Sequence, residues 1–401
     1  MSSTTGYSPL DTTRMAARVR PIGVSIFSEM SRLAVEHNAV NLSQGFPDFP
    51  APDWLKEAAR EAIARDINQY AVSHGSARLR KAIADKTERR MGIRFDENLE
   101  VTVTSGATEA VFDTIQALVN PGDEVIVFEP YYDSYVPGIQ IAGGVPRYVT
   151  LRPPDWRFDQ AELEGLFNER TRAIIVNTPH NPTGKVFTMH ELGLIAELCT
   201  RFDVIAITDE VYEHLVYDGH RHVHLAALPG MRNRTITISS AAKTFSVTGW
   251  KIGYALAAPD LSEALRRFHQ FVTFCSAAPL QDAVALAIET AEQRGYYDTL
   301  LAEYTARLDK LQGALDRAGL RPIRPQGTFF IMSDISRLGF EDDVQFARYM
   351  TTEVGVACIP PSAFYHNPAD GKGLARWCFA KRHDTLEAAE QRLLQWARGK
   401  A

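Results

Sequence analysis

The sequence has few cysteines, and their spacing suits neither a metal site nor a disulfide framework. Its 401 residues include four cysteines, at positions 199, 275, 358 and 378, and no two of them form a Cys-x-x-Cys pair. Four cysteines are also too few to crosslink a chain of this length. We therefore expect a protein of a reducing compartment that binds no metal.

Long apolar runs are missing as well. The start, MSSTTGYSPLDTTRMAARVR, has no apolar signal core, and no later segment approaches the roughly 20 apolar residues that a membrane span needs. The sequence thus predicts a cytoplasmic protein without a membrane partner, in which the Asn233-Arg234-Thr235 sequon has no role.

Charge of one sign is not concentrated in any segment. Lys and Arg total 43 and Asp and Glu total 49, which gives a formal charge of -6 without a basic run. This balance argues against a nucleic-acid partner and favours small molecules or another subunit. No Gly-x-Gly-x-x-Gly motif follows a strand pattern, which argues against a dinucleotide site.

Short apolar runs alternate instead with helical patterns. Runs rich in β-branched residues at 124–128, 173–177, 203–210 and 235–240 stop at polar or turn residues, as buried strands do. Helical patterns lie between them, at 108–118 and at 189–202, where Thr188 and Glu191 have the spacing of a capping box. The alternation predicts an α/β fold with a mostly parallel sheet covered on both faces.

The two ends of the chain have a different character. After about residue 290 the sequence predicts amphipathic helices, a strand pair near TFFIMSDI (328–335) and GVACIPP (355–361), and a final helix at 385–398. An amphipathic helix at 24–38 is expected to pack on this second lobe or to reach a neighbouring subunit. The expected domains are an N-terminal arm with part of the small domain (1–45), a large domain (46–290) and a small α+β domain (291–401).

Polar groups follow several of the predicted strands. After VTVT, the segment Ser105-Gly106-Ala107-Thr108 opens a helix whose free N–H groups suit a phosphate, although a simple capping turn has the same composition. After AIIVN, the segment NTPHNPTG forms an irregular turn that either aims Asn181 at a ligand or only reverses the chain.

Two charged residues stand at the ends of apolar strands. Asp209 needs a cationic partner there unless it only caps the next helix, and Tyr212 could share its pocket. Lys243 follows TITISS by three residues and is flanked by alanines, so its amine could be desolvated and nucleophilic, whereas most lysines are solvated surface charges. An imine-forming lysine, a phosphate cradle and an acid for a ring nitrogen are together the requirements of pyridoxal 5'-phosphate.

The motifs in combination resemble those of a known family. In chain order they are NLSQGFPDFPAP, HNPTG, TDEVYEHL, SSAAKTFSVTGWKIG and WCFAKRHDTL. The chain resembles the class I/II aminotransferases of fold type I over nearly its whole length, and most of all the branch with kynurenine, glutamine and methionine aminotransferases and the bacterial N-succinyldiaminopimelate aminotransferases. The resemblance implies pyridoxal 5'-phosphate, a homodimer with the active site at the subunit interface, and a seven-stranded, mostly parallel sheet beside a smaller α+β domain.

The resemblance also implies a role for each site residue. Lys243 forms the imine with the cofactor and then moves the proton, with Asp209 on the pyridinium nitrogen and Tyr212 and Asn181 on the phenolic oxygen. Other cofactor contacts are implied for Tyr132 (ring stacking), for Gly106, Ala107, Thr108, Ser240 and Lys251 (phosphate) and for Tyr70 (the phosphate of the neighbouring subunit). Substrate contacts are implied for Arg376, Asn181, Gly45 and Phe27, of which Arg376 holds the substrate carboxylate.

The sequence departs from the kynurenine-type enzymes at the substrate pocket. Ser276 and Ala277 stand where those enzymes have a Phe-His pair, and Phe27 stands near a tryptophan of some relatives. A wider pocket with weaker stacking argues against kynurenine as the preferred substrate. The expected reaction is ping-pong transamination between an L-amino acid and a 2-oxo acid. The expected donor is a large neutral amino acid of the methionine, glutamine, aromatic or kynurenine type.

Two further reactions stay open on the same scaffold. One is transamination of N-succinyldiaminopimelate in lysine biosynthesis, and the other is β-elimination from cysteine conjugates, which begins with the same loss of the Cα proton. A non-catalytic regulator with this fold is disfavoured because Lys243, Asp209 and Arg376 are all present.

Overall fold

The computed structural model describes residues 12–23 and 25–399. The first eleven residues, which include most of the segment without a signal core, and Val24, where the predicted first helix starts, lie outside the described residues. Among the described helices, none combines the length and the apolar character that crossing a lipid bilayer requires.

The β-branched runs form one central sheet of seven strands in the order β2-β8-β7-β6-β5-β3-β4. All neighbours pair in parallel except β8, which is antiparallel to both β2 and β7. The strands are β2 Val101–Thr104, β3 Glu124–Glu129, β4 Val145–Thr150, β5 Thr171–Asn177, β6 Ile205–Asp209, β7 Thr235–Ser240 and β8 Gly253–Leu256. The predicted mostly parallel sheet is confirmed.

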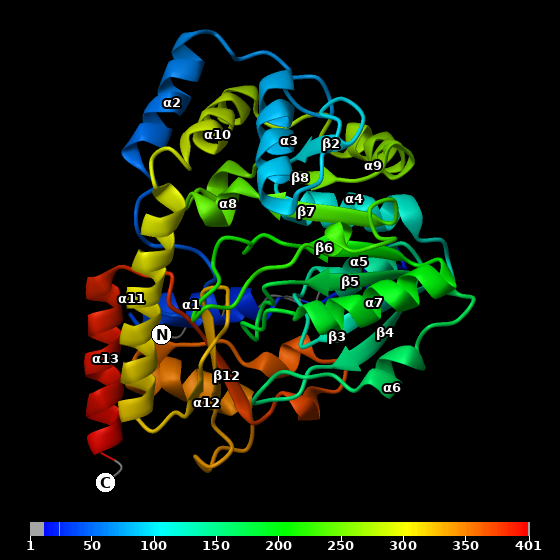
Figure 1. The fold of residues 1–401 in the computed structure, drawn as a ribbon. Helices are drawn as coiled ribbons and strands as arrows, with labels where there is room; N and C mark the ends of the chain where they lie inside the picture. Colours follow the sequence, from blue (N-terminus) through cyan, green and yellow to red (C-terminus); the bar gives the residue numbers. More distant parts are fainter. Residues whose placement is uncertain (1–11, 24, 400–401) are drawn as a thin grey trace.

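Successive residues of a strand face opposite sides of the sheet, and each side has its own helices. On β5, Ile174 and Val176 pack with helix α7, whereas Ala173 and Ile175 pack with helix α4. The large-lobe helices are α2 Asp53–Ala64, α3 Ala77–Met91, α4 Ala107–Leu118, α5 Tyr135–Ile141, α6 Gln160–Glu164, α7 Met189–Phe202, α8 Ala241–Thr244, α9 Pro259–Val272 and α10 Ala278–Thr290. Figure 1 shows these helices on both sides of the sheet.

Helix α7 begins and ends at the predicted residues. The Thr188 side chain accepts from the Glu191 N–H, and the Glu191 carboxylate accepts in return from the Thr188 N–H, so the predicted capping box is confirmed. At the other end Asp203 adopts a left-handed conformation with φ 54°. Both ends of this helix are therefore set by local sequence.

The C-terminal lobe pairs its strands differently from the prediction. Strand β10 (Phe330–Asp334) does not pair with the GVACIPP segment; it pairs antiparallel with β12 (Leu374–Cys378) and with β9 (Pro322–Ile323). Strand β11 (Val356–Ala357) instead pairs in parallel with β1 (Val40–Asn41). The predicted strand pair was wrong because β10 is paired on its two sides with β12 and with the nearby β9, while the GVACIPP segment pairs with the N-terminal β1.

The N-terminal segment packs into the same lobe. Met30 of helix α1 (Ile26–Glu36) and Leu42 belong to one core with residues of α11, α12 and α13. The remaining helices of this lobe are α11 Tyr296–Arg317, α12 Asp343–Tyr349 and α13 His383–Arg398. Helices α11 and α13 lie side by side along one edge of the molecule, as Figure 1 shows.

Candidate active site

The polar strand ends gather around one cavity of about 410 Å³. Strands β5, β6 and β7 run in parallel, so their last residues, Asn177, Asp209 and Ser240, lie at one edge of the sheet. Every site residue predicted from the sequence lines this cavity except Tyr70: Phe27, Gly45, Gly106, Ala107, Thr108, Tyr132, Asn181, Asp209, Tyr212, Ser240, Lys243, Lys251 and Arg376.

Lys243 reaches the cavity from helix α8, directly after β7. Its Nζ donates a 3.0 Å hydrogen bond to the Gly45 carbonyl oxygen and lies 5.3 Å from the centre of the Phe329 ring. Burial lowers the pKa of Lys243 to about 8, because an apolar environment disfavours the ammonium form. The amine can therefore lose and regain a proton near neutral pH.

Asp209 faces the cavity at the end of β6. Its Oδ2 accepts a 2.6 Å hydrogen bond from the Tyr135 hydroxyl, and its Oδ1 accepts from the Val211 N–H at 3.4 Å. Asn177 Nδ2 donates to the Asp209 carbonyl oxygen at 2.8 Å and fixes the backbone. Burial raises the pKa of Asp209, and both partners of its carboxylate are neutral, so a cation on the cavity side would stabilise the ionised form.

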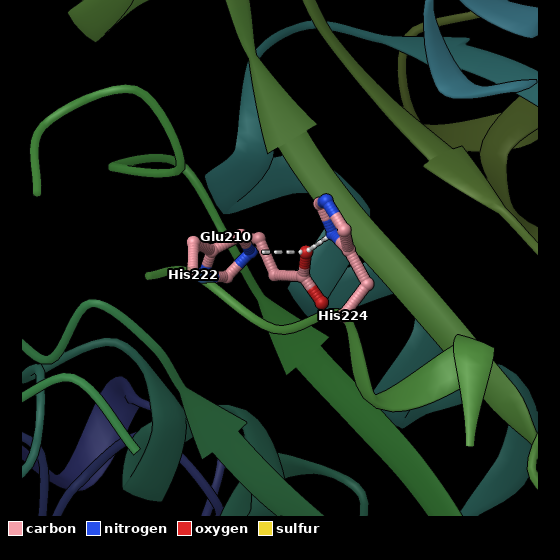
Figure 2. A group of neighbouring side chains, drawn as sticks. All are labelled: Glu210, His222 and His224. Atoms are coloured by element: carbon pink, nitrogen blue, oxygen red, sulfur yellow. Dashed lines mark hydrogen bonds and ion pairs between the residues drawn. The ribbon is translucent and has the colours of Figure 1, made fainter. Parts of the chain in front are cut away.

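The next residue, Glu210, belongs to a separate buried cluster. Figure 2 shows its carboxylate between two imidazoles: Oε2 accepts from His222 Nε2 at 2.8 Å and from His224 Nδ1. Thr208 donates to Oε1 at 2.8 Å. Burial alone would raise the pKa of Glu210, but the two histidines outweigh it and lower the pKa to about 2. Both carboxylate oxygens of Glu210 are thus hydrogen-bonded, and the cluster anchors the strand end that carries Asp209, while His222 Nδ1 has no partner among the described residues.

The small-residue turn after β2 lies close to the second lysine. Gly106 has φ 84°, and a Cβ placed there would lie 3.1 Å from Lys251 Nζ. A Cβ at Gly253 would lie 2.4 Å from the carbonyl carbon of Gly106, so this contact between β8 and the turn needs glycine. The turn therefore combines the free N–H groups at the start of α4 with a lysine amine, a combination suited to an anion.

The Ser240 hydroxyl makes two hydrogen bonds to backbone groups at the same edge of the sheet. It donates to the Ile252 carbonyl oxygen at 3.0 Å and accepts from the Ala242 N–H at 3.0 Å. Ser240 thereby closes the segment that holds both lysines against the end of β7.

Arg376 enters the cavity from β12 and is 1% exposed. Its guanidinium donates to Asn181 Oδ1 at 3.1 Å and to the Ser43 carbonyl oxygen at 2.9 Å, while Nε has no partner among the described residues. Burial lowers the pKa of Arg376 to about 10. A buried guanidinium with only neutral partners is costly, and an anion in the cavity would relieve this cost.

Aromatic rings surround this guanidinium. Its central carbon lies 4.1 Å from the centre of the Phe330 ring and 4.9 Å from that of Phe27. A Cβ at Gly45 would lie 2.8 Å from the Phe330 ring, so a side chain at this position would displace the ring beneath Arg376. Gly45 thus keeps its carbonyl near Lys243 and its Cα hydrogen against Phe330.

Two tyrosines complete the walls. Tyr212 is 3% exposed and packs edge-on to Phe329 at 5.0 Å between ring centres. Burial raises the pKa of Tyr132 to about 12 and that of Tyr212 well above its ordinary value, so both hydroxyls stay protonated and can donate.

Tyr70 is the predicted residue that the cavity of its own chain does not include. Its side chain is 83% exposed and packs edge-on to Phe274 at 5.3 Å. Ser276 and Ala277 are also absent from the cavity lining; Ser276 is buried, with its hydroxyl 3.3 Å from that of Ser105.

Sequence reasoning missed several residues of the site. Tyr135 and Asn177 hold Asp209, Gln44 donates to the Phe27 carbonyl oxygen, and Asp133 accepts from Ser25. All of them lie within a few residues of Tyr132, Asn181 or Gly45 in the sequence. That closeness is the feature by which sequence reasoning could have found them.

The whole chain is similar to known aminotransferases. The family model described as aminotransferase class I and II matches residues 37–393. The chain belongs to this family. Methionine aminotransferase of Escherichia coli K12 is 42% identical over 379 residues, with 94% of this chain and 97% of that protein aligned. A probable N-succinyldiaminopimelate aminotransferase of Mycobacterium tuberculosis is 44% identical over 388 residues, with 94% and 97% aligned.

A solved structure agrees with this assignment. The crystal structure of an Escherichia coli enzyme with methionine aminotransferase function superposes with a TM-score of 0.91 at 41% identity, covering 95% of this chain and 99% of that one. This chain is accordingly a fold type I aminotransferase that uses pyridoxal 5'-phosphate and exchanges an amino group between an amino acid and a 2-oxo acid.

The residues of the cavity fit this cofactor. A buried lysine whose pKa lies near neutrality, a carboxylate with neutral partners, and a turn with free N–H groups beside Lys251 are complementary to an aldehyde, a pyridinium and a phosphate. The Arg376 Nε without a partner lies in the same cavity and can serve the second ligand, the substrate.

Proposed function

We propose that Lys243, Asp209 and Tyr212 carry the chemistry of this aminotransferase. When bound, pyridoxal 5'-phosphate supplies an electrophilic carbonyl and a ring that stabilises negative charge at the substrate Cα. With the cofactor bound, Lys243 Nζ would accept the proton from the substrate Cα and would donate it to the former carbonyl carbon of the cofactor, which its lowered pKa permits. Asp209 holds a proton on the ring nitrogen, and the hydroxyl of Tyr212 donates to the phenolic oxygen together with Asn181 Nδ2.

The phosphate is assigned to the turn after β2. We propose that Gly106, Ala107 and Thr108 bind it with Ser240 and the Lys251 amine, and that Tyr132 stacks on the ring. The N–H groups of Ala107 and Thr108 would donate to the phosphate, whereas the Gly106 N–H donates to the Thr104 carbonyl oxygen and Gly106 contributes by lacking a Cβ. Support comes from the contact of Lys251 with Gly106 and from the position of all five residues on the cavity wall.

The amino donor is assigned as a large neutral L-amino acid of the methionine, glutamine or aromatic type. The observation that carries this proposal is the set of cations on the cavity wall, namely Lys243, Lys251 and Arg376. The two lysines are assigned to the cofactor, so Arg376 alone remains for a carboxylate. The cavity wall also includes Phe27, Phe46 and Phe330, whose apolar rings favour an uncharged side chain.

A donor panel tests this assignment. Methionine, glutamine, phenylalanine, kynurenine and N-succinyldiaminopimelate are each mixed with the purified enzyme, and single-turnover kcat/KM is read from the cofactor spectrum. We expect the neutral donors to exceed N-succinyldiaminopimelate by about tenfold or more, since no cation on the described cavity wall is left for its distal carboxylates. A higher value for N-succinyldiaminopimelate would overturn the assignment.

Transamination of N-succinyldiaminopimelate is the second candidate. It is favoured by the 44% identity to the probable N-succinyldiaminopimelate aminotransferase. A cation for its distal carboxylate would have to come from a second copy of the chain. Elimination from cysteine conjugates is tested in the same assay, because it releases pyruvate and ammonia without a 2-oxo acid.

We also propose a homodimer in which Tyr70 reaches the phosphate of the neighbouring subunit. Exposed apolar side chains form what we call the apolar patch: Tyr70 (83% exposed), Val72 (58%), Phe271 (86%), Val272 (47%) and Phe274 (48%). A patch of large apolar groups on the surface is typical of an interface. Within each subunit we propose a large domain at 46–290 and a small domain formed by 291–401 with residues 1–45.

A further inference from the structure

A histidine outside the cavity holds an unusual charge. His269 of α9 is 0% exposed, and its Nδ1 lies 3.0 Å from Glu109 Oε1 while its Nε2 lies 2.9 Å from the Ser73 carbonyl oxygen. A carbonyl oxygen accepts hydrogen bonds and cannot donate them, and the same is true of an ionised carboxylate. Both ring nitrogens must therefore donate, which makes His269 an imidazolium.

A second carboxylate faces the same ring. Asp113 Oδ2 lies 3.6 Å from His269 Nδ1, and neither oxygen of the fully buried Asp113 has a hydrogen-bond partner among the described residues. Burial alone would lower the pKa of His269, but the neighbouring carboxylates of Asp113 and Glu109 outweigh it and raise the pKa to about 10. The geometry and the charges thus agree on a protonated ring.

The neighbouring basic residues Arg266 and His74 do not supply the positive charge that faces Glu109 and Asp113. Arg266, on the same helix, donates to Thr102 Oγ1 and to two backbone carbonyls. Burial lowers the pKa of His74 to about 4, so His74 is neutral. His269 is the cation that faces both acids of α4, and burial raises the pKa of the second acid, Asp113.

Glu109 transmits the position of this cation to the phosphate turn. Its Oε2 accepts from the Ser105 N–H, directly before Gly106, and its Oε1 accepts from the Thr273 hydroxyl as well as from His269. The Glu109 carboxylate is therefore hydrogen-bonded to the phosphate turn at Ser105, to His269 of helix α9 and to Thr273, the residue before Phe274.

The other nitrogen of His269 holds a second segment. Ser73 lies three residues after Tyr70, whose ring packs on Phe274. The two segments that carry the apolar patch are thus fastened side by side by the same imidazolium that fixes Glu109.

We propose that His269 is a positioning residue, a buried imidazolium that sets the phosphate turn and the apolar patch relative to each other. Cofactor retention and pairing with a second copy of this chain then both depend on it. This inference rests on the proposed roles of the turn and of the patch, and it adds a physical connection between them.

The protonation is tested by nitrogen NMR of the holoenzyme labelled with ¹⁵N-histidine. The signals of His269 are assigned by their loss in His269→Gln. At neutral pH we expect both ring nitrogens at the chemical shifts of protonated imidazole. A neutral tautomer at neutral pH would overturn the proposal.

The positioning role is tested by release of pyridoxal 5'-phosphate, measured without any amino donor so that a wrong donor assignment cannot affect it. His269→Gln is neutral and loses its charge-assisted bond to Glu109, so we expect roughly tenfold faster release and a weaker dimer. Ile195→Val changes a buried residue of α7 that does not line the cavity, and it serves as a control for lowered stability. Release no faster than in this control, or an unchanged dimer dissociation constant, would refute the role.

A double-mutant cycle shows whether His269 acts through Glu109. Glu109→Gln keeps an acceptor for the Ser105 N–H but removes the charge. We expect Glu109→Gln and the double variant to release the cofactor at about the rate of His269→Gln, because the three changes break one connection. Rates that multiply in the double variant would contradict the connection.

Discussion

The Tyr135 hydroxyl donates a 2.6 Å hydrogen bond to Asp209 Oδ2, and both groups are buried. Burial raises the pKa of the Tyr135 hydroxyl well above its ordinary value, so it remains a donor. Asp209 is therefore held from the side opposite to the Val211 N–H, and its remaining capacity to accept faces the cavity.

Removal of this hydroxyl should disturb the carboxylate without removing it. In Tyr135→Phe we expect kcat to fall roughly tenfold, because a hydrogen bond to a charged group is lost. Cofactor binding should weaken by a similar factor. Steady-state kinetics and cofactor titration measure both, and wild-type values for both would mean that Tyr135 only fills space.

Alanine substitutions of the two lysines in the 241–252 segment should have different effects on activity and on cofactor binding. Lys243→Ala should lose transamination even with the cofactor bound. Lys251→Ala should mainly weaken cofactor binding and recover part of its turnover at high cofactor concentration, because the amine lies against the Gly106 turn. Activity assays across a cofactor series distinguish the two, and a Lys251→Ala enzyme that binds the cofactor firmly but stays inactive would refute the phosphate role.

Arg376 should act on the substrate and not on the cofactor. Arg376→Lys keeps the charge but loses the planar fork, so we expect kcat/KM for the amino donor to fall about tenfold, and about a hundredfold in Arg376→Gln. Cofactor affinity should change little in either. The half-reaction spectra measure kcat/KM, and equal losses for the lysine and glutamine variants would argue against bidentate binding.

The buried amine of Lys243 should make the stability of the cofactor-free protein depend on pH. Its pKa falls from 10.5 to about 8 on folding, so between these values the unfolded chain binds the proton that the folded chain has lost. Unfolding then takes up a proton, and the contribution of this group to stability rises with pH.

Lys243→Met isolates this contribution. Below pH 8 the variant should be more stable than the wild type, and the difference should shrink as the pH rises towards 10.5. Denaturant unfolding of both proteins at a series of pH values measures it, and other titrating groups cancel in the comparison. A difference that does not vary with pH would show that the lysine is not desolvated.

Mixed dimers should reveal which subunit uses Tyr70. Tyr70→Ala and Lys243→Ala are each expected to be nearly inactive alone. If Tyr70 serves the neighbour, a dimer of one Tyr70→Ala and one Lys243→Ala subunit has one intact site, and activity should return on mixing. If each tyrosine served its own subunit, no intact site would form and activity would stay low.

Local sequence predicted the elements whose boundaries are set locally. The strand at 235–240 coincides with the β-branched run TITISS. The helix at 189–202 begins at its capping box and ends before the left-handed Asp203. The short strands β1, β9 and β11 have only two residues each, which is too few for any periodicity to be recognised. Strands β1 and β11 pair with each other although they are far apart in the sequence, and this pairing takes up the segment that was predicted to pair with β10.

The site was predictable where a residue type itself implies chemistry. A lysine, an aspartate or an arginine in an apolar stretch demands a partner, and Lys243, Asp209 and Arg376 indeed line one cavity. The tyrosines of EPYYDSY are chemically equivalent in the sequence, and only the start of helix α5 at Tyr135 decides which one meets Asp209. His269 looked like any polar residue of an amphipathic helix.

The reversed direction of β8 ties the two lysines to a single excursion of the chain. Gly253 at the start of β8 pairs with Thr104 at the end of β2 and with Ser240 at the end of β7. The chain therefore leaves the sheet edge after Ser240 and returns to the same edge at Gly253. Both ends of this excursion are fixed by pairing, and an insertion or deletion within it shifts both amines at once. The lysine proposed for the imine and the lysine proposed for the phosphate can therefore be altered separately only by substitution.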